Sequence, residues 1–127
     1  MPKRVLIVED DETRYEWFRR RLSACDIAVT CDAARACELL ARNEYDLILL
    51  DHDLLGEHYF SDEPDDERTG YAVAAWLAAR PGSQPAAQIV IHSLNDAGAQ
   101  RMLEALVAAG FDAECIPFHY LQRELRF

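Results

Sequence analysis

The fold class of this chain is decided by the stretch Asp46-Leu47-Ile48-Leu49-Leu50-Asp51-His52-Asp53. Four consecutive apolar residues without alternation are typical of a strand in a parallel sheet that helices cover on both faces. Two carboxylates and a histidine follow the apolar run at once. The stretch therefore predicts a central buried strand with polar side chains gathered at its carboxyl end.

The rest of the chain alternates between short apolar runs and segments with helical spacing. We expect strands at 4–9, 27–31, 46–51, 88–92 and 113–116, and helices at about 13–24, 33–42, 70–79 and 96–109. A helical tail follows Pro117 and runs through Leu121 and Leu125. Such alternation predicts an α/β fold, a flavodoxin-like, doubly wound parallel sheet in the order 2-1-3-4-5 with helices on both faces.

Length and charge limit the range of functions. The 127 residues fit a single domain spanning 1–127, with an acidic loop insertion at about 56–69 that is either a solvated segment or a lid. The formal charge of −10 disfavours duplex DNA as a partner. Apolar runs are too short to span a membrane and no signal-peptide core is visible, so we expect a cytoplasmic protein. The four cysteines lack CxxC spacing and are interpreted as reduced packing residues.

The predicted topology brings polar residues from three neighbouring strands into one crevice. Glu9-Asp10 would follow the first strand, Asp51-His52-Asp53 the third and His92-Ser93 the fourth. Carboxylates that share one pocket stay ionised only if a cation offsets their charge, so a divalent metal is expected. The alternative is that each acidic group is a solvated turn or a helix N-cap.

With these strand ends placed, the chain resembles the receiver domains of bacterial response regulators. The residues that carry the resemblance are Val5 to Asp11, which match the opening strand and acidic pair, Asp46 to Asp51, which match the strand ending in the phosphorylated aspartate, and Ser93, at the hydroxyl position. The resemblance implies that Glu9 and Asp10 bind Mg²⁺ or Mn²⁺.

In the same family pattern, Asp51 and Asp53 complete the metal site, the latter through its backbone, and Asp51 is the nucleophile toward a phosphoryl group. Receivers generally carry a lysine where this chain has Ile116, and their loop after the third strand is shorter. The segments Leu50 to Leu54 and His92 to Asn95 resemble instead a divergent branch, the cyclic-phosphate-processing receiver domains.

That branch implies handling of a cyclic phosphate, on an RNA end or a nucleotide. His52 and His92 could then share the roles of general base and general acid, because an unperturbed imidazole titrates near neutral pH. Ser93, Asn95 and Asp53 would contact the phosphate. As alternatives, His92 is a satisfied structural histidine, His52 points to solvent, and Asn95 only caps the next helix.

Three functions are compatible with the sequence. The favoured hypothesis is a metal-dependent domain that recognises or processes a phosphoryl group, with cyclic phosphodiesterase activity as its enzymatic form. The main alternative is a phosphoacceptor receiver, phosphorylated on Asp51 by a histidine kinase and read by a downstream protein. The second alternative is a degenerate receiver that acts only as a protein-interaction module.

Overall fold

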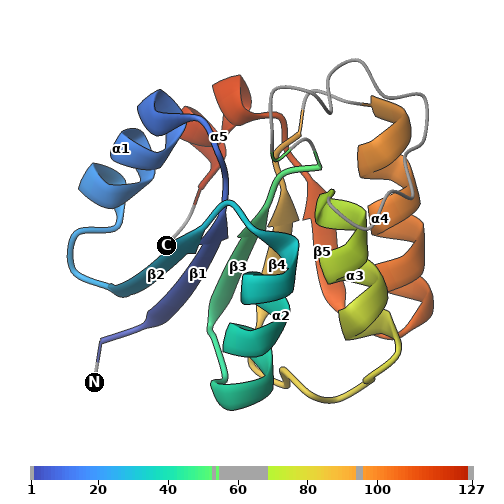
Figure 1. The fold of residues 1–127 in the computed structure, drawn as a ribbon. Helices are drawn as coiled ribbons and strands as arrows, with labels where there is room; N and C mark the ends of the chain where they lie inside the picture. Colours follow the sequence, from blue (N-terminus) through green and yellow to red (C-terminus); the bar gives the residue numbers. More distant parts are fainter. Residues whose placement is uncertain (1, 53, 55–68, 94–95, 126–127) are drawn as a thin grey trace.

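The computed structural model describes residues 2–52, 54, 69–93 and 96–125 (Figure 1). The chain forms a five-stranded, all-parallel sheet in the order β2-β1-β3-β4-β5. The strands are β1 (Arg4–Val8), β2 (Asp26–Thr30), β3 (Leu47–Leu50), β4 (Gln88–Ile91) and β5 (Asp112–Cys115). The predicted fold class and strand order are confirmed.

Five helices connect or follow the strands in the described part of the chain. They are α1 (Glu12–Arg21), α2 (Ala33–Arg42), α3 (Gly70–Ala78), α4 (Asp96–Ala108) and α5 (Phe118–Glu124). Most bounds agree with the expectations within one or two residues, but α1 ends about three residues before the predicted end. The predicted acidic loop lies almost entirely outside the described residues.

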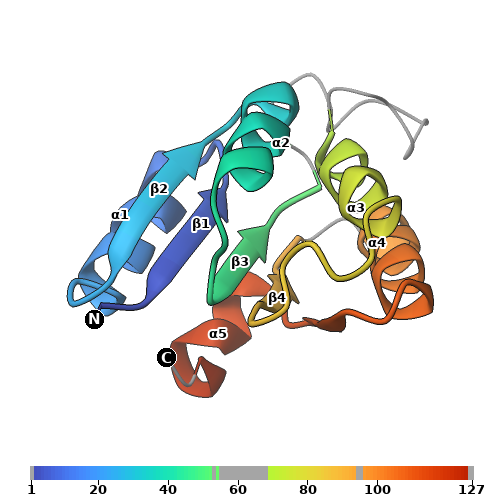
Figure 2. The same cartoon turned by 90° about the horizontal axis from the view of Figure 1, so that it is seen from below.

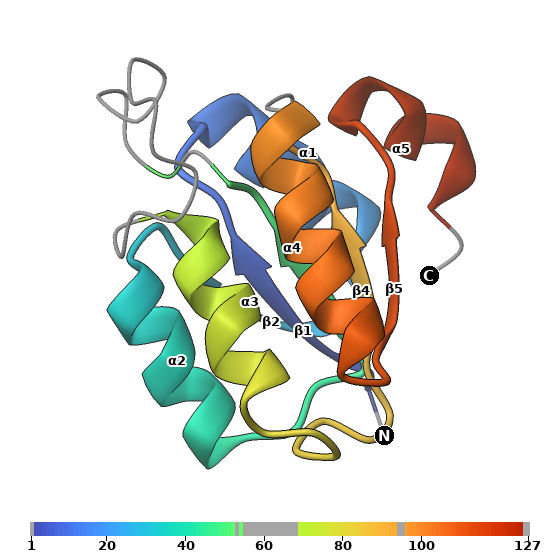
Figure 3. The same cartoon turned by 90° about the vertical axis from the view of Figure 1, so that its right-hand side faces the viewer.

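The helices form one layer on each face of the sheet. Figure 2 shows α1 and α5 on one face, and Figure 3 shows α2, α3 and α4 side by side on the other. Each face has its own hydrophobic core, one around Phe18 and Leu121 and the other around Leu40, Leu77 and Met102. Because both faces are covered, the central strands carry continuous apolar runs.

The register of the central strands positions the polar residues that follow them. Val8 pairs with Leu50, and Leu50 pairs with Ile91, so the last residues of β1, β3 and β4 lie side by side. All three are buried. The residue that follows each strand therefore emerges at the same level of the same sheet edge.

Side chains at the helix starts explain where several helices begin. Asp32 accepts hydrogen bonds from backbone amides in the first turn of α2, and Asp11 does the same for α1. Thr69 caps α3. Gly110 follows α4 with a φ of 91°, a left-handed conformation that glycine adopts without strain.

Among the described helices, none has the length and apolar character that a bilayer-crossing segment requires.

Candidate functional site

Three buried polar side chains meet at the carboxyl edge of the sheet. Glu9 directly follows β1, Asp51 follows β3 and His92 follows β4. One donor atom from each of them lies within 4.8 Å of the other two. The structure thus brings together residues that are separated by up to 83 positions in the sequence, as the topology predicted.

His92 is hydrogen-bonded to Glu9. Its Nε2 lies 2.8 Å from Oε1 of Glu9, and neither side chain is accessible to solvent. Burial lowers the pKa of His92 to about 4, so the imidazole is neutral at pH 7. Because a carboxylate only accepts hydrogen bonds, the neutral ring donates its Nε2 proton to Glu9. The Nδ1 atom is buried and has no hydrogen-bond partner within the described residues.

The environment of Asp51 opposes its ionisation. Burial, together with the neighbouring Glu9 carboxylate, raises the pKa of Asp51 to about 7, although the charge interaction with His92 and a hydrogen bond with Ser93 act in the opposite direction. The side chain of Asp51 is almost fully inaccessible. A carboxylate in this position is a group whose charge a bound cation would stabilise.

The second oxygen of Glu9 binds the backbone at the start of the next loop. Oε2 accepts hydrogen bonds of 3.0 Å from the amides of Asp10 and Asp11. Burial and the nearby Glu9 raise the pKa of Asp10 to about 6. Oδ1 of Asp10 is buried without a partner among the described residues, and Asp10 is not one of the three clustered ligands. Asp11 has a structural role as the N-cap of α1.

These observations fit a divalent cation. Glu9, Asp10 and Asp51 offer carboxylate oxygens, one of them buried and unpartnered, in a place where repulsion and burial already disfavour negative charge. Carboxylate oxygens are ligands that both Mg²⁺ and Mn²⁺ accept. The donor set therefore suits either ion.

No sequence pattern identifies Arg14, which also lies at this edge. Its Nη1 lies 3.4 Å from Oδ2 of Asp51 and 3.8 Å from Oε1 of Glu9, and its side chain is only 15% exposed. Arg14 belongs to the first turns of α1, where no motif marks it. Only the packing of α1 on the sheet brings this guanidinium to the acidic edge.

His52 and Ser93 are both buried at the same edge. The alternative that His52 points to solvent is wrong, because its ring packs against α4 at Gly98. A Cβ atom on Gly98 would lie 2.5 Å from ring atoms of His52. The predicted phosphate contacts Asp53 and Asn95 lie outside the described residues.

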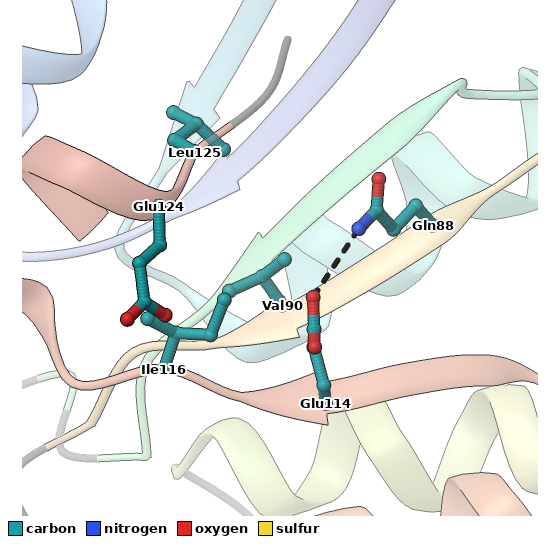
Figure 4. Close-up of a pocket in the computed structure, with 6 residues that line it drawn as sticks. All are labelled: Gln88, Val90, Glu114, Ile116, Glu124 and Leu125. Carbon is teal, nitrogen blue, oxygen red and sulfur yellow. Dashed lines mark hydrogen bonds between the residues drawn. The ribbon is translucent and has the colours of Figure 1, made fainter. Parts of the chain in front are cut away.

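Two hollows are relevant to the choice of site. One, of about 470 Å³, lies beside the acidic edge and is lined by Glu9, Asp10, Asp11, Glu12, Tyr15, Val29, Thr30 and Cys31. Another, of about 610 Å³, lies between α5 and the sheet and is lined by Gln88, Val90, Glu114, Ile116, Glu124 and Leu125 (Figure 4). The second includes none of the predicted catalytic, phosphate-binding or metal-binding residues, so we place the candidate site at the first.

The parallel sheet, its strand order and the polar edge define a receiver-fold domain. Residues 5–108 match the family model described as "Cyclic-phosphate processing Receiver domain", and the chain belongs to this family. A search of curated proteins found no match.

Solved receiver domains share the fold at low sequence identity. A CheY-like receiver domain from Methylobacillus flagellatus is 19% identical, with a TM-score of 0.62 over 98% of this chain and 97% of that one. A Burkholderia pseudomallei response regulator, solved with a phosphorylated aspartic acid, calcium ion and citrate, is 19% identical, with a TM-score of 0.64 over 98% and 66%. The Mn²⁺-bound response regulator Rcp1 is 18% identical, with a TM-score of 0.63 over 91% and 81%.

Proposed function

We propose that this domain binds a divalent cation, Mg²⁺ or Mn²⁺, and uses it to recognise or process a phosphoryl group. The observation that carries the proposal is the buried cluster of Glu9, Asp51 and His92, whose donor atoms lie within 4.8 Å of one another. The unpartnered oxygen of Asp10 supports it. Two of the solved relatives are described with a bound cation, Ca²⁺ in one and Mn²⁺ in the other.

The substrate class we propose is a cyclic phosphate, of the 2′,3′-cyclic type found on RNA ends and nucleotides. Family membership supports this class. The chain also has isoleucine, not lysine, at position 116, and two buried histidines at the site edge, which departs from the usual receiver pattern. The hollow beside this edge is lined by Glu9 and Asp10, so a small ligand bound there would lie next to these two carboxylates.

We assign the cation to Glu9, Asp10 and Asp51, with the backbone of Asp53 as the family pattern implies. The cation would neutralise charge that develops on the phosphoryl oxygens. His92 holds Glu9 in place through its Nε2 proton. Because its pKa is lowered to about 4, a neutral His92 is able to accept a proton but not to donate one as an acid at pH 7. The acid role would then fall to His52.

The test is a metal-dependent assay against 2′,3′-cyclic nucleotides, cyclic-ended RNA and the matching linear monoesters. We expect turnover of the cyclic esters by the wild type with Mg²⁺ or Mn²⁺, at least about 100-fold less by Asp51→Asn and His92→Ala, and none with EDTA. His119→Ala is the matched control, because His119 is exposed and lies on α5. Absence of any turnover, together with absence of binding to these esters, would contradict the cyclic-phosphate assignment.

The second candidate function is that of a phosphoacceptor in two-component signalling. It is favoured by the position of Asp51 at the end of β3 and by the phosphorylated aspartic acid described for the Burkholderia pseudomallei relative. Acetyl phosphate with Mg²⁺ would then add about 80 Da to the wild type and nothing to Asp51→Asn, as mass spectrometry detects. The partners would be a histidine kinase and a downstream protein.

A further inference from the structure

The guanidinium group of Arg14 lies at the acidic edge of the sheet. Nη1 of Arg14 contacts both Asp51, at 3.4 Å, and Glu9, at 3.8 Å. Charge-assisted hydrogen bonds between nitrogen and carboxylate oxygen are usually about 2.7–2.9 Å long, so both contacts are loose. Both contacts also involve the same nitrogen, Nη1. The N–H groups on Nε and Nη2, which point in parallel like the prongs of a fork, are therefore available to an oxyanion.

The position of this guanidinium is set by the place of Arg14 on α1 and by one aromatic neighbour. Arg14 is anchored at the start of α1, where its backbone amide donates to the capping carboxylate of Asp11. Its guanidinium carbon lies 5.4 Å from the ring centroid of Phe118, a cation–π distance. Phe118 in turn packs edge-on against Phe18, with centroids 5.5 Å apart. The arginine is thus held against an aromatic wall and directed at the acidic edge.

Phe118, the aromatic residue that Arg14 contacts, lies close in sequence to the position where receivers generally carry a lysine. Ile116 stands in that position, carries no charge and is 9% exposed. Phe118 follows two residues later and begins α5. The β5–α5 segment thus has no lysine charge at position 116, and the guanidinium of Arg14 on α1 lies against Phe118 at the end of this segment.

We propose that Arg14 is the anion-binding residue of this site and contacts the phosphoryl oxygens directly. This inference rests on the proposed function and names a residue that the sequence pattern does not mark. Without an anion, Arg14 neutralises part of the charge of Asp51 and Glu9. When a divalent cation takes these carboxylates, the guanidinium is released toward the anion, because the two cations share the same ligands.

This arrangement gives Arg14 opposite effects on two ligands. Removing its charge should strengthen cation binding, because one competitor for Asp51 and Glu9 is lost. The same change should weaken anion binding, because a charge-assisted, fork-shaped donor is lost. A residue that only stabilises the fold would not shift the two affinities in opposite directions.

The experiment measures Mg²⁺ binding, and then inorganic phosphate binding at saturating Mg²⁺, by calorimetry on the full chain. For Arg14→Met we expect Mg²⁺ affinity to rise by about 3-fold or more and phosphate affinity to fall by about 10-fold or more. Arg14→Lys keeps the charge without the fork and should lose less phosphate affinity. Thermal unfolding checks that each variant folds.

Arg19→Met is the matched control, because Arg19 lies on the same helix and pairs with the exposed Glu16. It should change neither affinity. If Arg14→Met binds phosphate as tightly as the wild type, Arg14 does not contact the anion, and the inference is wrong while the proposed function stands. If the wild type binds Mg²⁺ but neither phosphate nor 2′,3′-cyclic AMP, the proposed function fails and this inference fails with it.

Discussion

Nε2 of His92 lies 2.8 Å from Oε1 of Glu9 in a place that solvent does not reach. The other oxygen of Glu9 accepts two backbone amide protons, from Asp10 and Asp11, so three hydrogen bonds fix this carboxylate. These hydrogen bonds hold the carboxylate of Glu9 in a single orientation, and a cation would bind it in that orientation. His92 therefore contributes to the site even where it does not touch a ligand.

The first prediction concerns the strength of this hydrogen bond. His92→Leu leaves Oε1 of Glu9 buried without its imidazole donor, which should lower the free energy of unfolding by about 2–3 kcal/mol. His92→Gln retains an N–H donor and should lose less. Urea unfolding at pH 7.5 with EDTA measures both variants. Equal stability of His92→Leu and the wild type would show that the bond contributes nothing in solution.

The second prediction concerns Asp51 in the metal-free protein. Its pKa is raised from 3.8 to about 7, mainly by burial, so the folded state holds a proton that the unfolded state releases between these values. Its contribution to stability is therefore present at low pH and is lost as pH rises through that window. Asp51→Asn removes the ionisable group and should increase the free energy of unfolding at pH 8 by up to about 4 kcal/mol, since one pKa unit corresponds to about 1.4 kcal/mol.

Urea unfolding in EDTA at pH 8 and pH 5 checks this expectation. The difference between Asp51→Asn and the wild type should shrink at pH 5, where Asp51 is mostly protonated and as neutral as asparagine. Mg²⁺ or Mn²⁺ should stabilise the wild type at pH 8 and have much less effect on the variant. If Asp51→Asn is less stable than the wild type at pH 8, the site does not disfavour the ionised form of Asp51 and the prediction is wrong.

The meeting of Glu9, Asp51 and His92 was predictable from the sequence, because it depends on where the strands end and on the strand order of the flavodoxin-like pattern. Apolar runs mark those ends, and parallel topology places them at one edge. The contact of His92 with Glu9 was not predictable, since a residue that follows a strand is free to turn in several directions.

The positions of the Arg14 and His52 side chains were not predictable from the sequence either. Arg14 is one of four arginines in α1, and helical periodicity does not reveal which of them reaches a neighbouring strand end. His52 was open to a solvent-facing interpretation because its burial depends on α4, whose small residue Gly98 leaves room for the ring. In both cases the outcome is set by how helices pack on the sheet.

The third prediction concerns thiol reactivity. Cys31 is exposed, whereas burial raises the pKa of Cys37 and of Cys115. Because the thiolate is the reactive form, Cys31 should react with iodoacetamide at pH 8 about 10-fold faster than either of them. Peptide mass spectrometry over time measures the three rates, and the same reaction in urea is the control, where they should become similar. Faster labelling of Cys37 than of Cys31 would contradict the packing of α2.

The fourth prediction uses the contact between α4 and His52. Replacing a glycine by alanine within a helix usually stabilises a protein by about 1 kcal/mol. At Gly98 the added Cβ would lie 2.5 Å from ring atoms of His52, so the ring has to move. We therefore expect Gly98→Ala to lower the free energy of unfolding by about 1–3 kcal/mol, the opposite of the usual sign.

A double-mutant cycle separates this contact from other effects of the substitution. In a His52→Ala background the ring is absent, so Gly98→Ala should become neutral or stabilising, as it is in an ordinary helix. Urea unfolding of the four proteins gives the coupling energy between the two positions. If Gly98→Ala costs the same free energy with and without the ring, His52 does not pack against α4 in solution. A coupling of about 1 kcal/mol or more would show that α4 holds His52 at the acidic edge.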